Sequence, residues 1–517
     1  MKRKRIFPLT ALVLLFALLA SSCGGGKTPA EQTTAATSAT ATATAATTAT
    51  TATTEATTTA VSTVEPYTPP GDFNGYVFNV VGTSVYSGQK WTGHTWKDDE
   101  PQNALENRLL QEYRNLEKRL NIKFTYDTAS ITNILASAAA GKYVGDIFSL
   151  QQHYWAALAI SGEILPLNTD QIRSAGLDVD DPEQVDYYYT QTSKQLDGEN
   201  VWAIAFSGEY GIQRFGKFTV FNKRILECAG YPADTMYQLV RDGEWTWDKF
   251  DEICRAIAQT DYTEYIEENL YPYYKRVRAY ISTMDDDKAM TEMYIFTPIV
   301  TESNGVWRSK VDSSEFRTAF EKLKSFFDSY DTNLVESENN MSQGNSDFVY
   351  FCNNQLGFSF LDSSRFGFEY DSCNLTMEGD YGFLPLPKAV PDGEYVNILS
   401  TTEGICIPSA VSDPSRSAYI LSQLAEILND PKQQRGWLRG MARDDESVEM
   451  LTEYILPNQI MPVHILSYKL YEVADDLAED IGCNWAGHGY NRLKSLDEII
   501  STYHPKLQAA LDELFEQ

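Results

Sequence analysis

Apolar positions along the chain predict strands that alternate with helices. Short apolar runs at residues 76–81, 122–126 and 146–150 are typical of buried strands. Apolar residues recur at helical spacing over 104–120, and a helix rich in small residues is expected over 131–140. Strand, helix, strand, helix, strand at this spacing indicates a parallel sheet that helices cover on both faces.

The central stretch, residues 197–230, predicts the crossing between two halves of the protein. Two short and almost wholly apolar runs, 201–206 and 218–221, are consistent with buried strands. Asn222 then begins an expected helix that Gly230 ends. An ordinary connection between a strand and a helix is the alternative interpretation of this stretch.

The residues around Thr246 carry the signals of a helix start. Thr246 is an expected N-cap, because its hydroxyl can accept a hydrogen bond from the first turn. Trp245 and Phe250 then occupy the two positions of a hydrophobic staple. We therefore expect these aromatic residues to pack in the core.

Two further helices are predicted near the carboxyl end of the chain. Asp413 is an expected N-cap, and Pro414 is an expected first helical residue. The last segment, 496–515, has helical spacing. Because proline cannot donate a backbone hydrogen bond, we expect a break in this segment at Pro505.

The amino-terminal residues predict an export signal and a tether. Residues 1–22 combine a charged start with an apolar stretch that is short for a membrane span, as in a signal peptide. The sequence LLASSC makes Cys23 the expected lipidated residue, with plain secretion as the alternative. Residues 23–70 comprise Cys23 and a predicted disordered tether, and the Thr/Ala-rich part of it, 27–70, would have a reach of roughly 35–40 Å. No other segment has the length of a membrane helix.

Charge and aromatic content narrow the class of ligand. The 517 residues carry a formal net charge of −30, and removal of the signal peptide with its four basic residues would make it −34. Such a surface repels phosphate backbones, so no nucleic-acid partner is expected. The chain has 31 Tyr, 24 Phe and 9 Trp, and this surplus suits stacking on the flat apolar faces of sugar rings.

The sequence contains none of the common catalytic or cofactor motifs. It has no GxSxG elbow, P-loop, HExxH, CxxC pair or full GxGxxG. The chain has five His, so a clustered metal site is not expected. Because these motifs are missing, no cofactor and no catalytic residue are expected either. Cys352 and Cys373 could form a disulfide or could remain free thiols.

Several of these segments, taken in order, resemble family 1 extracellular solute-binding proteins, the ligand-capturing subunits of ABC importers. The segments 197–230, 246–248, 381–388 and 401–430 are similar to motifs of that family in the same order. Trp202 stands where the family usually has Tyr. The resemblance covers roughly residues 72–517. The matching residues of the crossing are Asp197, Gly198, Asn222, Lys223, Leu226, Ala229 and Gly230.

The resemblance implies an α/β fold of two lobes, of the periplasmic-binding-protein type II kind. Its sheets would be rich in parallel strands and covered by helices, with a hinge between the lobes. The implied N-terminal lobe is 71–205 with 398–458, and the implied C-terminal lobe is 206–397 with 459–517.

The resemblance also implies a function without catalysis. The protein would be a monomer, held outside the cytoplasm by lipid on Cys23, that captures a carbohydrate, expected to be an oligosaccharide, and delivers it to an ABC permease. Aromatic and charged residues that follow strands or lie in polar loops are the expected ligand contacts. These are Trp91, Trp96, Tyr154, Trp155 and Glu403 in the first lobe, Glu209 and Tyr210 near the crossing, and Glu302, Trp307, Asp362, Arg365 and Trp485 in the second.

Two alternatives from other functional classes stay open at this point. One is an exported hydrolase that acts on glycans, since paired acidic residues could perform such chemistry. The other is a surface lipoprotein without a role in transport.

Overall fold

A computed structural model of the chain divides it into two units, residues 1–61 and 62–517. The predicted signal peptide, the lipidated Cys23 and almost all of the tether lie outside the described residues. The structure describes residues 66–83, 104–207, 216–269, 277–281, 286–328, 346–366, 377, 379–399, 403–486 and 494–515.

Within these ranges, no helix combines the length and the apolar character that a membrane crossing needs.

The first sheet has five strands in the order β2-β1-β3-β11-β4. β1 lies parallel to both β2 and β3, whereas β11 lies antiparallel to β3 and β4. The three strands predicted at the start of the body are therefore parallel neighbours, as expected. The bounds are β1 Tyr76–Gly82, β2 Ile122–Thr128, β3 Ile147–Gln151, β4 Ile164–Leu165 and β11 Glu403–Pro408.

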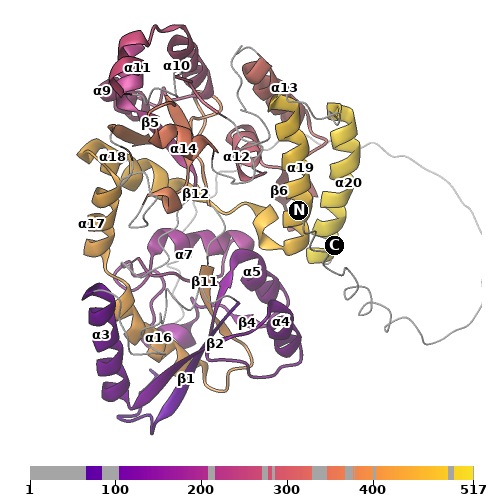
Figure 1. The fold of residues 1–517 in the computed structure, drawn as a ribbon. Helices are drawn as coiled ribbons and strands as arrows, with labels where there is room; N and C mark the ends of the chain where they lie inside the picture. Colours follow the sequence, from indigo (N-terminus) through magenta and orange to yellow (C-terminus); the bar gives the residue numbers. More distant parts are fainter. Residues whose placement is uncertain are drawn as a thin grey trace, which may run out of the picture. The chain divides into compact units, whose positions relative to one another are not determined.

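Helices cover both faces of this sheet, which confirms the prediction from strand and helix spacing. Side chains of α3 and α16 pack with Phe78 and Val80 on one face. Side chains of α4 and α5 pack with Val81 and Phe148 on the other. Figure 1 shows the two pairs of helices on opposite sides of the strands. The bounds are α3 Ala104–Leu120, α4 Ile131–Ala139, α5 Gln152–Ile160, α6 Asp170–Ser174, α7 Tyr187–Ser193, η1 Lys194–Leu196 and α16 Pro414–Leu428.

The second sheet differs from the expectation of sheets rich in parallel strands. Its order is β8-β5-β9, and both neighbours of β5 are antiparallel to it. β5 leads away from the crossing, whereas β8 and β9 run back toward it, so the pairs cannot be parallel. The bounds are β5 Phe218–Asn222, β8 Phe358–Leu361 and β9 Tyr381–Leu384.

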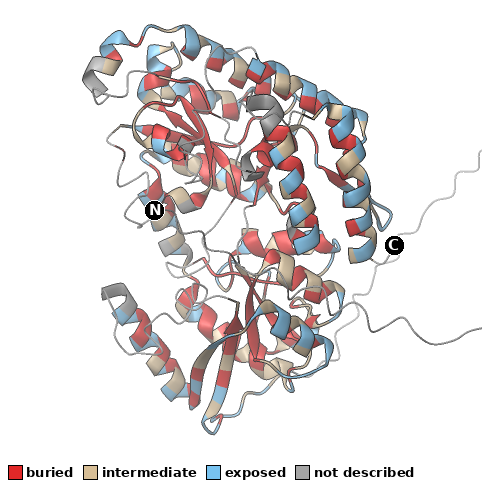
Figure 2. Cartoon of the chain, turned by 45° about the vertical axis from the view of Figure 1, so that its right-hand side comes forward, coloured by how far each residue is buried: buried red, intermediate tan, exposed pale blue. Residues whose placement is uncertain are grey.

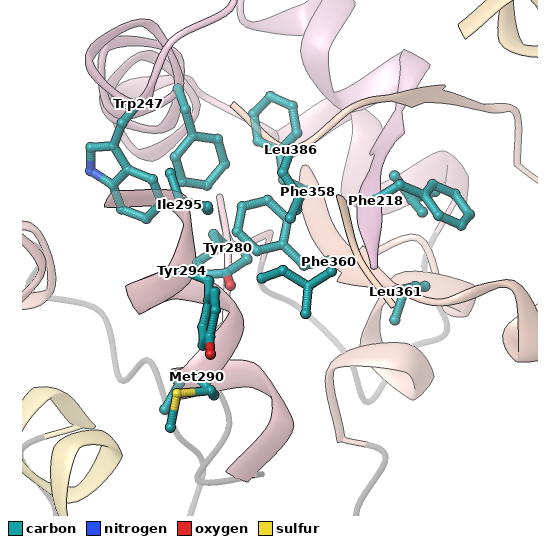
Figure 3. Packing of buried hydrophobic residues seen from close by; sticks show 14 of the residues in the cluster. Phe218, Trp247, Tyr280, Met290, Tyr294, Ile295, Phe358, Phe360, Leu361 and Leu386 are labelled. Atoms are coloured by element: carbon teal, nitrogen blue, oxygen red, sulfur yellow. The ribbon is translucent and has the colours of Figure 1, made fainter. Parts of the chain in front are cut away.

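An aromatic core fills the space between this sheet and its helices. Phe250 of α10 contacts both Phe358 and Phe360 of β8, with ring centroids 5.2 and 5.5 Å apart. Figure 3 shows Tyr280 beside Phe360 in the same cluster. The helices are α8 Lys223–Cys228, α9 Ala233–Arg241, α10 Trp247–Gln259, α11 Thr263–Asn269, α12 Asp286–Phe296, α13 Ser314–Asp328 and α14 Ser346–Cys352.

The helix starts predicted from capping residues are confirmed. The Thr246 hydroxyl accepts a hydrogen bond from the backbone N–H of Lys249 at 3.3 Å. The rings of Trp245 and Phe250 pack edge to face, with centroids 6.1 Å apart. Asp413 likewise accepts a hydrogen bond from the first turn of α16, with Pro414 as its first residue.

The predicted break at Pro505 is wrong, because α20 runs without interruption over Leu496–Leu514. Pro505 is exposed, so water can reach the carbonyl that it leaves without a helical partner. Tyr503 and Leu507, on either side of it, are buried in the core. Packing on both sides therefore holds the helix together.

The carboxyl-terminal third of the chain contacts both sheets. Leu438, Met441 and Met450 belong to the cluster around the second sheet, and Met461 belongs to the cluster around the first. Figure 2 shows buried residues along the strands and exposed residues on the outer faces of the helices. The remaining elements are β6 Val300–Ser303, β7 Val306–Ser309, η3 Ser363–Arg365, β10 Asn397–Ile398, α17 Pro431–Met441, α18 Asp445–Glu449, η4 Met450–Ile455 (a π-helical turn), η5 Leu456–Asn458, β12 Gln459–Ile460, η6 Val463–Leu466 and α19 Tyr468–Ala486.

Cys352, for which a disulfide with Cys373 was one possibility, is a free thiol. Cys373 lies outside the described residues.

Candidate functional site

The first group of candidate residues lies where the parallel strands of the first sheet end. β3 ends at Gln151, and β11 runs the other way and begins at Glu403, directly opposite Gln151. The carboxyl ends of strands are where open sheets bind ligands. This edge, which we call the first edge, therefore presents Gln151 and Glu403 side by side.

Polar and aromatic residues lie in β3 and directly after it, at the first edge. Glu403 is half-buried, and its carboxylate accepts a hydrogen bond from the Ser149 hydroxyl at 3.4 Å. The half-buried Tyr154 lies in the first turn of α5, with its ring 3.9 Å from the ring of His153. Burial lowers the pKa of His153 to about 4, so this imidazole is neutral at neutral pH.

A second group lies at one edge of the second sheet. Lys217 directly precedes β5, and Asp362 directly follows β8, which is antiparallel to β5. Their charged groups are 4.0 Å apart, with side chains 12% and 17% exposed. Arg365 lies in the next turn, with its guanidinium 5.4 Å from the ring centre of Phe348. We call this group the second edge.

A short connection joins the two edges. The backbone N–H of Lys217 donates to the carbonyl of Ile398 at 2.9 Å. Glu403 follows Ile398 by five positions, which a fully extended chain spans in at most about 18 Å. The charged residues of both edges therefore lie near the segments that pass from one sheet to the other.

Two of the predicted ligand contacts lie elsewhere in the fold. Glu302 and Trp307 face each other across the β6–β7 hairpin. The ring of Trp307 stacks on Phe515 with centroids 4.8 Å apart, and its carbonyl accepts a hydrogen bond from Gln508 of α20. These contacts place the pair against the last helix.

Trp155 also differs from an open ligand contact, because it is fully buried. It packs in the cluster between the first sheet and α4, with Ile134 and Leu158.

The side chains of five predicted ligand contacts lie outside the described residues. Trp485 belongs to the last turn of α19, but its side chain lies outside the described residues. Trp91, Trp96, Glu209 and Tyr210 lie wholly outside them.

Lys217, Ser149 and His153 lie at the two edges, but the sequence patterns did not indicate them. Each of them lies inside, or within three residues of, a strand that the sequence predicted. A search of every residue that flanks a predicted strand would have found Lys217. Nothing in the sequence shows that Ser149 faces Glu403, because the two residues are distant in the chain.

The site offers hydrogen-bonding groups of both charges and no metal-binding cluster. Among the described residues, no three His, Cys, Asp or Glu side chains are grouped so that they could hold a metal ion. Carboxylates accept hydrogen bonds and a lysine ammonium group donates them, so the two edges together can bind a ligand that does both.

Comparison with known proteins identifies the fold. No family model matches the chain, and no curated protein sequence matches it. Among solved structures, the sugar-binding protein MalE from Xanthomonas citri is 13% identical, with a TM-score of 0.55, over 85% of this chain and 97% of that one. A sugar transporter from Rhizobium etli in an open conformation is 14% identical, with a TM-score of 0.55, over 84% and 100%.

A third structure has the same fold and a different ligand. UgpB from Mycobacterium tuberculosis, in complex with glycerophosphocholine, is 15% identical, with a TM-score of 0.51, over 85% of this chain and 98% of that one. The chain therefore has the two-lobed fold of the periplasmic-binding-protein kind, as the sequence predicted.

Proposed function

We propose that the protein is the solute-binding component of an ABC importer and that it captures a carbohydrate without altering it. The observation that carries this proposal is the fold, which extends over nearly the full length of proteins named for sugar binding. The charged residues at the two sheet edges support it, since both groups lie near the segments that join the sheets.

The mechanism follows from two lobes joined by short segments. A solute that contacts both edges stabilises the closed arrangement of the lobes more than the open one, because only closure brings both sets of groups to it. Glu403 at the first edge would accept hydrogen bonds from the solute. Lys217 and Asp362 at the second edge would form hydrogen bonds with it from the other lobe. A permease would then recognise the closed form.

A sugar is the proposed ligand class. Sugar hydroxyls donate and accept hydrogen bonds, which suits a site with carboxylates, amides and a lysine. Glycerophosphocholine, the ligand of UgpB, belongs in any test because it has the same kind of hydroxyl groups.

We also propose that the protein is held outside the cytoplasm by lipid on Cys23 and acts as a monomer. The signal-like residues 1–22 and the Thr/Ala-rich tether support this placement.

We propose a revised boundary between the lobes. The first lobe would comprise roughly residues 71–205 with 398–430. The second lobe would then gain residues 431–458, since Leu438 and Met450 pack around the second sheet.

A thermal-shift screen tests the proposed function. The panel is glucose, maltose, maltotriose, glycerophosphocholine and a tripeptide. At least one carbohydrate should raise the melting temperature in proportion to the logarithm of its concentration, because it binds the folded state alone. No new reducing ends should appear during incubation with maltotriose, and their appearance would indicate a hydrolase.

Site variants locate the binding. Asp362→Ala and Glu403→Ala should each weaken the affinity for the stabilising sugar about tenfold or more, because each removes a charged hydrogen-bond partner. Asp445→Ala is the matched control, since that carboxylate is 91% exposed and lies on α18. Unchanged affinity in both site variants would show that the solute binds elsewhere.

A further inference from the structure

A cavity of about 270 Å³ lies between α5 and two helices of the proposed second lobe. Its walls are the second half of α5, the start of α19 and the end of α20, and Figure 1 shows these helix ends next to α5. The volume is about twenty times the space that one buried water needs, so the cavity has room for a group of many atoms. Small ligands often bind where two domains meet.

The lining of the cavity combines apolar surface with hydrogen-bonding groups. Lys469 and Glu513 form an ion pair, and their side chains are 53% and 65% exposed, so a ligand can reach both. The pair has no net charge, which favours a neutral ligand whose hydroxyls accept from the ammonium group and donate to the carboxylate. A sugar ring has such hydroxyls together with apolar C–H faces. The apolar part of the lining is Ala157, Ile160, Ala510 and Leu514.

Four aromatic residues lie where α5 meets the start of α19. The centre of the His153 ring is 3.9 Å from that of Tyr154, 6.2 Å from that of Tyr468 and 6.4 Å from that of Tyr471. Tyr468 is 57% exposed, and the residue after it, Lys469, lines the cavity. An exposed tyrosine ring offers a flat apolar face on which a sugar ring can stack.

Helix α5 connects the cavity to the first edge. Gln151, at the first edge, directly precedes α5. Ala157 follows six positions later, which is about 9 Å along a helix. Residues three apart share a helix face, so Tyr154 and Ala157 lie on the same side of α5. A chain of sugar units held at the first edge can therefore reach the cavity along this face.

We propose that the cavity and the exposed ring of Tyr468 form an extension subsite, which binds one further sugar unit of an oligosaccharide held at the first edge. This inference rests on the proposed function and deepens it, because it assigns the protein a preference for oligosaccharides over shorter sugars.

The test measures affinity along two series of increasing length, glucose to maltotetraose and glucose to cellotetraose, by isothermal titration calorimetry. In one series, the last unit that contacts the wild type should raise the affinity about tenfold. Ala157→Leu should abolish this gain, because the larger side chain fills the cavity, and should leave the affinity for the shorter members unchanged. Ala509→Leu is the matched control and should keep the gain, since Ala509 is exposed on α20 and lies outside the lining of the cavity.

A second variant, Tyr468→Ala, tests the stacking face without a change in the core, because this ring is exposed. It should reduce the same gain by about threefold or more. Tyr187→Ala is its matched control, since Tyr187 is also the first residue of a helix and is 42% exposed. The control should leave the gain unchanged. If Ala157→Leu does not fold, Tyr468→Ala decides the question alone.

The outcomes separate the two claims. If no carbohydrate raises the melting temperature of the wild type, the proposed function fails, and the subsite fails with it. If a carbohydrate does so but the affinity rises along neither series, the subsite alone is overturned. Folded Ala157→Leu and Tyr468→Ala variants that both keep the full gain would also overturn it, because the added unit would then bind elsewhere.

Discussion

At the scale of single residues, Asp444 shows how partly buried polar groups hold α8 and α9 to α18. Its carboxylate lies 2.6 Å from the ammonium group of Lys223 and accepts a hydrogen bond from the Tyr237 hydroxyl at 2.6 Å. The backbone N–H of Ser447 donates to the same carboxylate at 2.7 Å. Burial raises the pKa of Asp444, but the hydrogen bonds from these three residues outweigh it and lower the pKa.

The first prediction concerns the pH dependence of Asp444→Asn. The substitution should lower the free energy of unfolding by about 2 kcal/mol at pH 7, because it breaks a partly buried charge pair. The folded pKa lies below the unfolded value of about 3.9, so the contribution of Asp444 is present above that pH and is lost as the pH falls through the folded pKa. The difference from the wild type should therefore shrink in acid.

Urea titrations at a series of pH values measure this difference. Asp445→Asn serves as the control, since its carboxylate is exposed. If the difference in free energy of unfolding between wild type and Asp444→Asn stays constant down to pH 3, the ionised carboxylate is not the source of the stabilisation.

At the scale of elements, the last helix depends on packing more than on local preference. α20 begins with a full capping box, in which Ser495 and Glu498 bond to each other's backbone N–H. It then passes through Pro505, which local rules would place at a helix end. Its buried residues on both sides of the proline, among them Ile499 and Leu511, pack in the core and offset the lost hydrogen bond.

The second prediction follows from the presence of Pro505 inside a helix that core packing keeps intact. Pro505→Ala should raise the free energy of unfolding by about 1–3 kcal/mol, because it restores a backbone donor inside the helix. Thermal and urea denaturation measure the change. Ala509→Gly, at an exposed position of the same helix, should instead lower the free energy of unfolding by about 1 kcal/mol. A loss of stability in Pro505→Ala would mean that the proline ring itself contributes to packing.

At the scale of the whole described body, two chain segments touch where they pass between the sheets. A Cβ on Gly216 would lie 1.9 Å from the carbonyl oxygen of Ile398 and 2.6 Å from the backbone N of Leu399. These atoms belong to backbone, so they cannot move aside as a flexible side chain would. Close approach of the two segments therefore requires glycine at position 216.

The third prediction tests this contact. Gly216→Ala should lower the free energy of unfolding by more than about 2 kcal/mol, because the two segments must separate to admit one methyl group. Gly436→Ala is the control, since a Cβ there would meet nothing within 4 Å in helix α17. The free energy of unfolding of Gly436→Ala should rise by about 0.5–1 kcal/mol. Equal stability of Gly216→Ala and the wild type would show that the contact is loose.

The sequence by itself determined the local features of this protein. The apolar runs that form β1, β2 and β3, the caps at Thr246 and Asp413 and the staple of Trp245 on Phe250 all depend on residues that are neighbours in the chain. Local spacing and capping chemistry specify such features directly, and for this reason their prediction succeeded. The two-lobed fold was predicted from the resemblance of several segments, taken in order, to family 1 extracellular solute-binding proteins.

Only the tertiary structure decided which distant segments meet. The antiparallel pairing of the second sheet, the approach of Lys217 to Asp362 and the meeting of α5 with the start of α19 all join residues that are far apart in the chain. No local pattern encodes these contacts, because burial of the apolar faces as a whole selects them. The continuity of α20 through Pro505 has the same cause, since packing in the core outweighed a local preference.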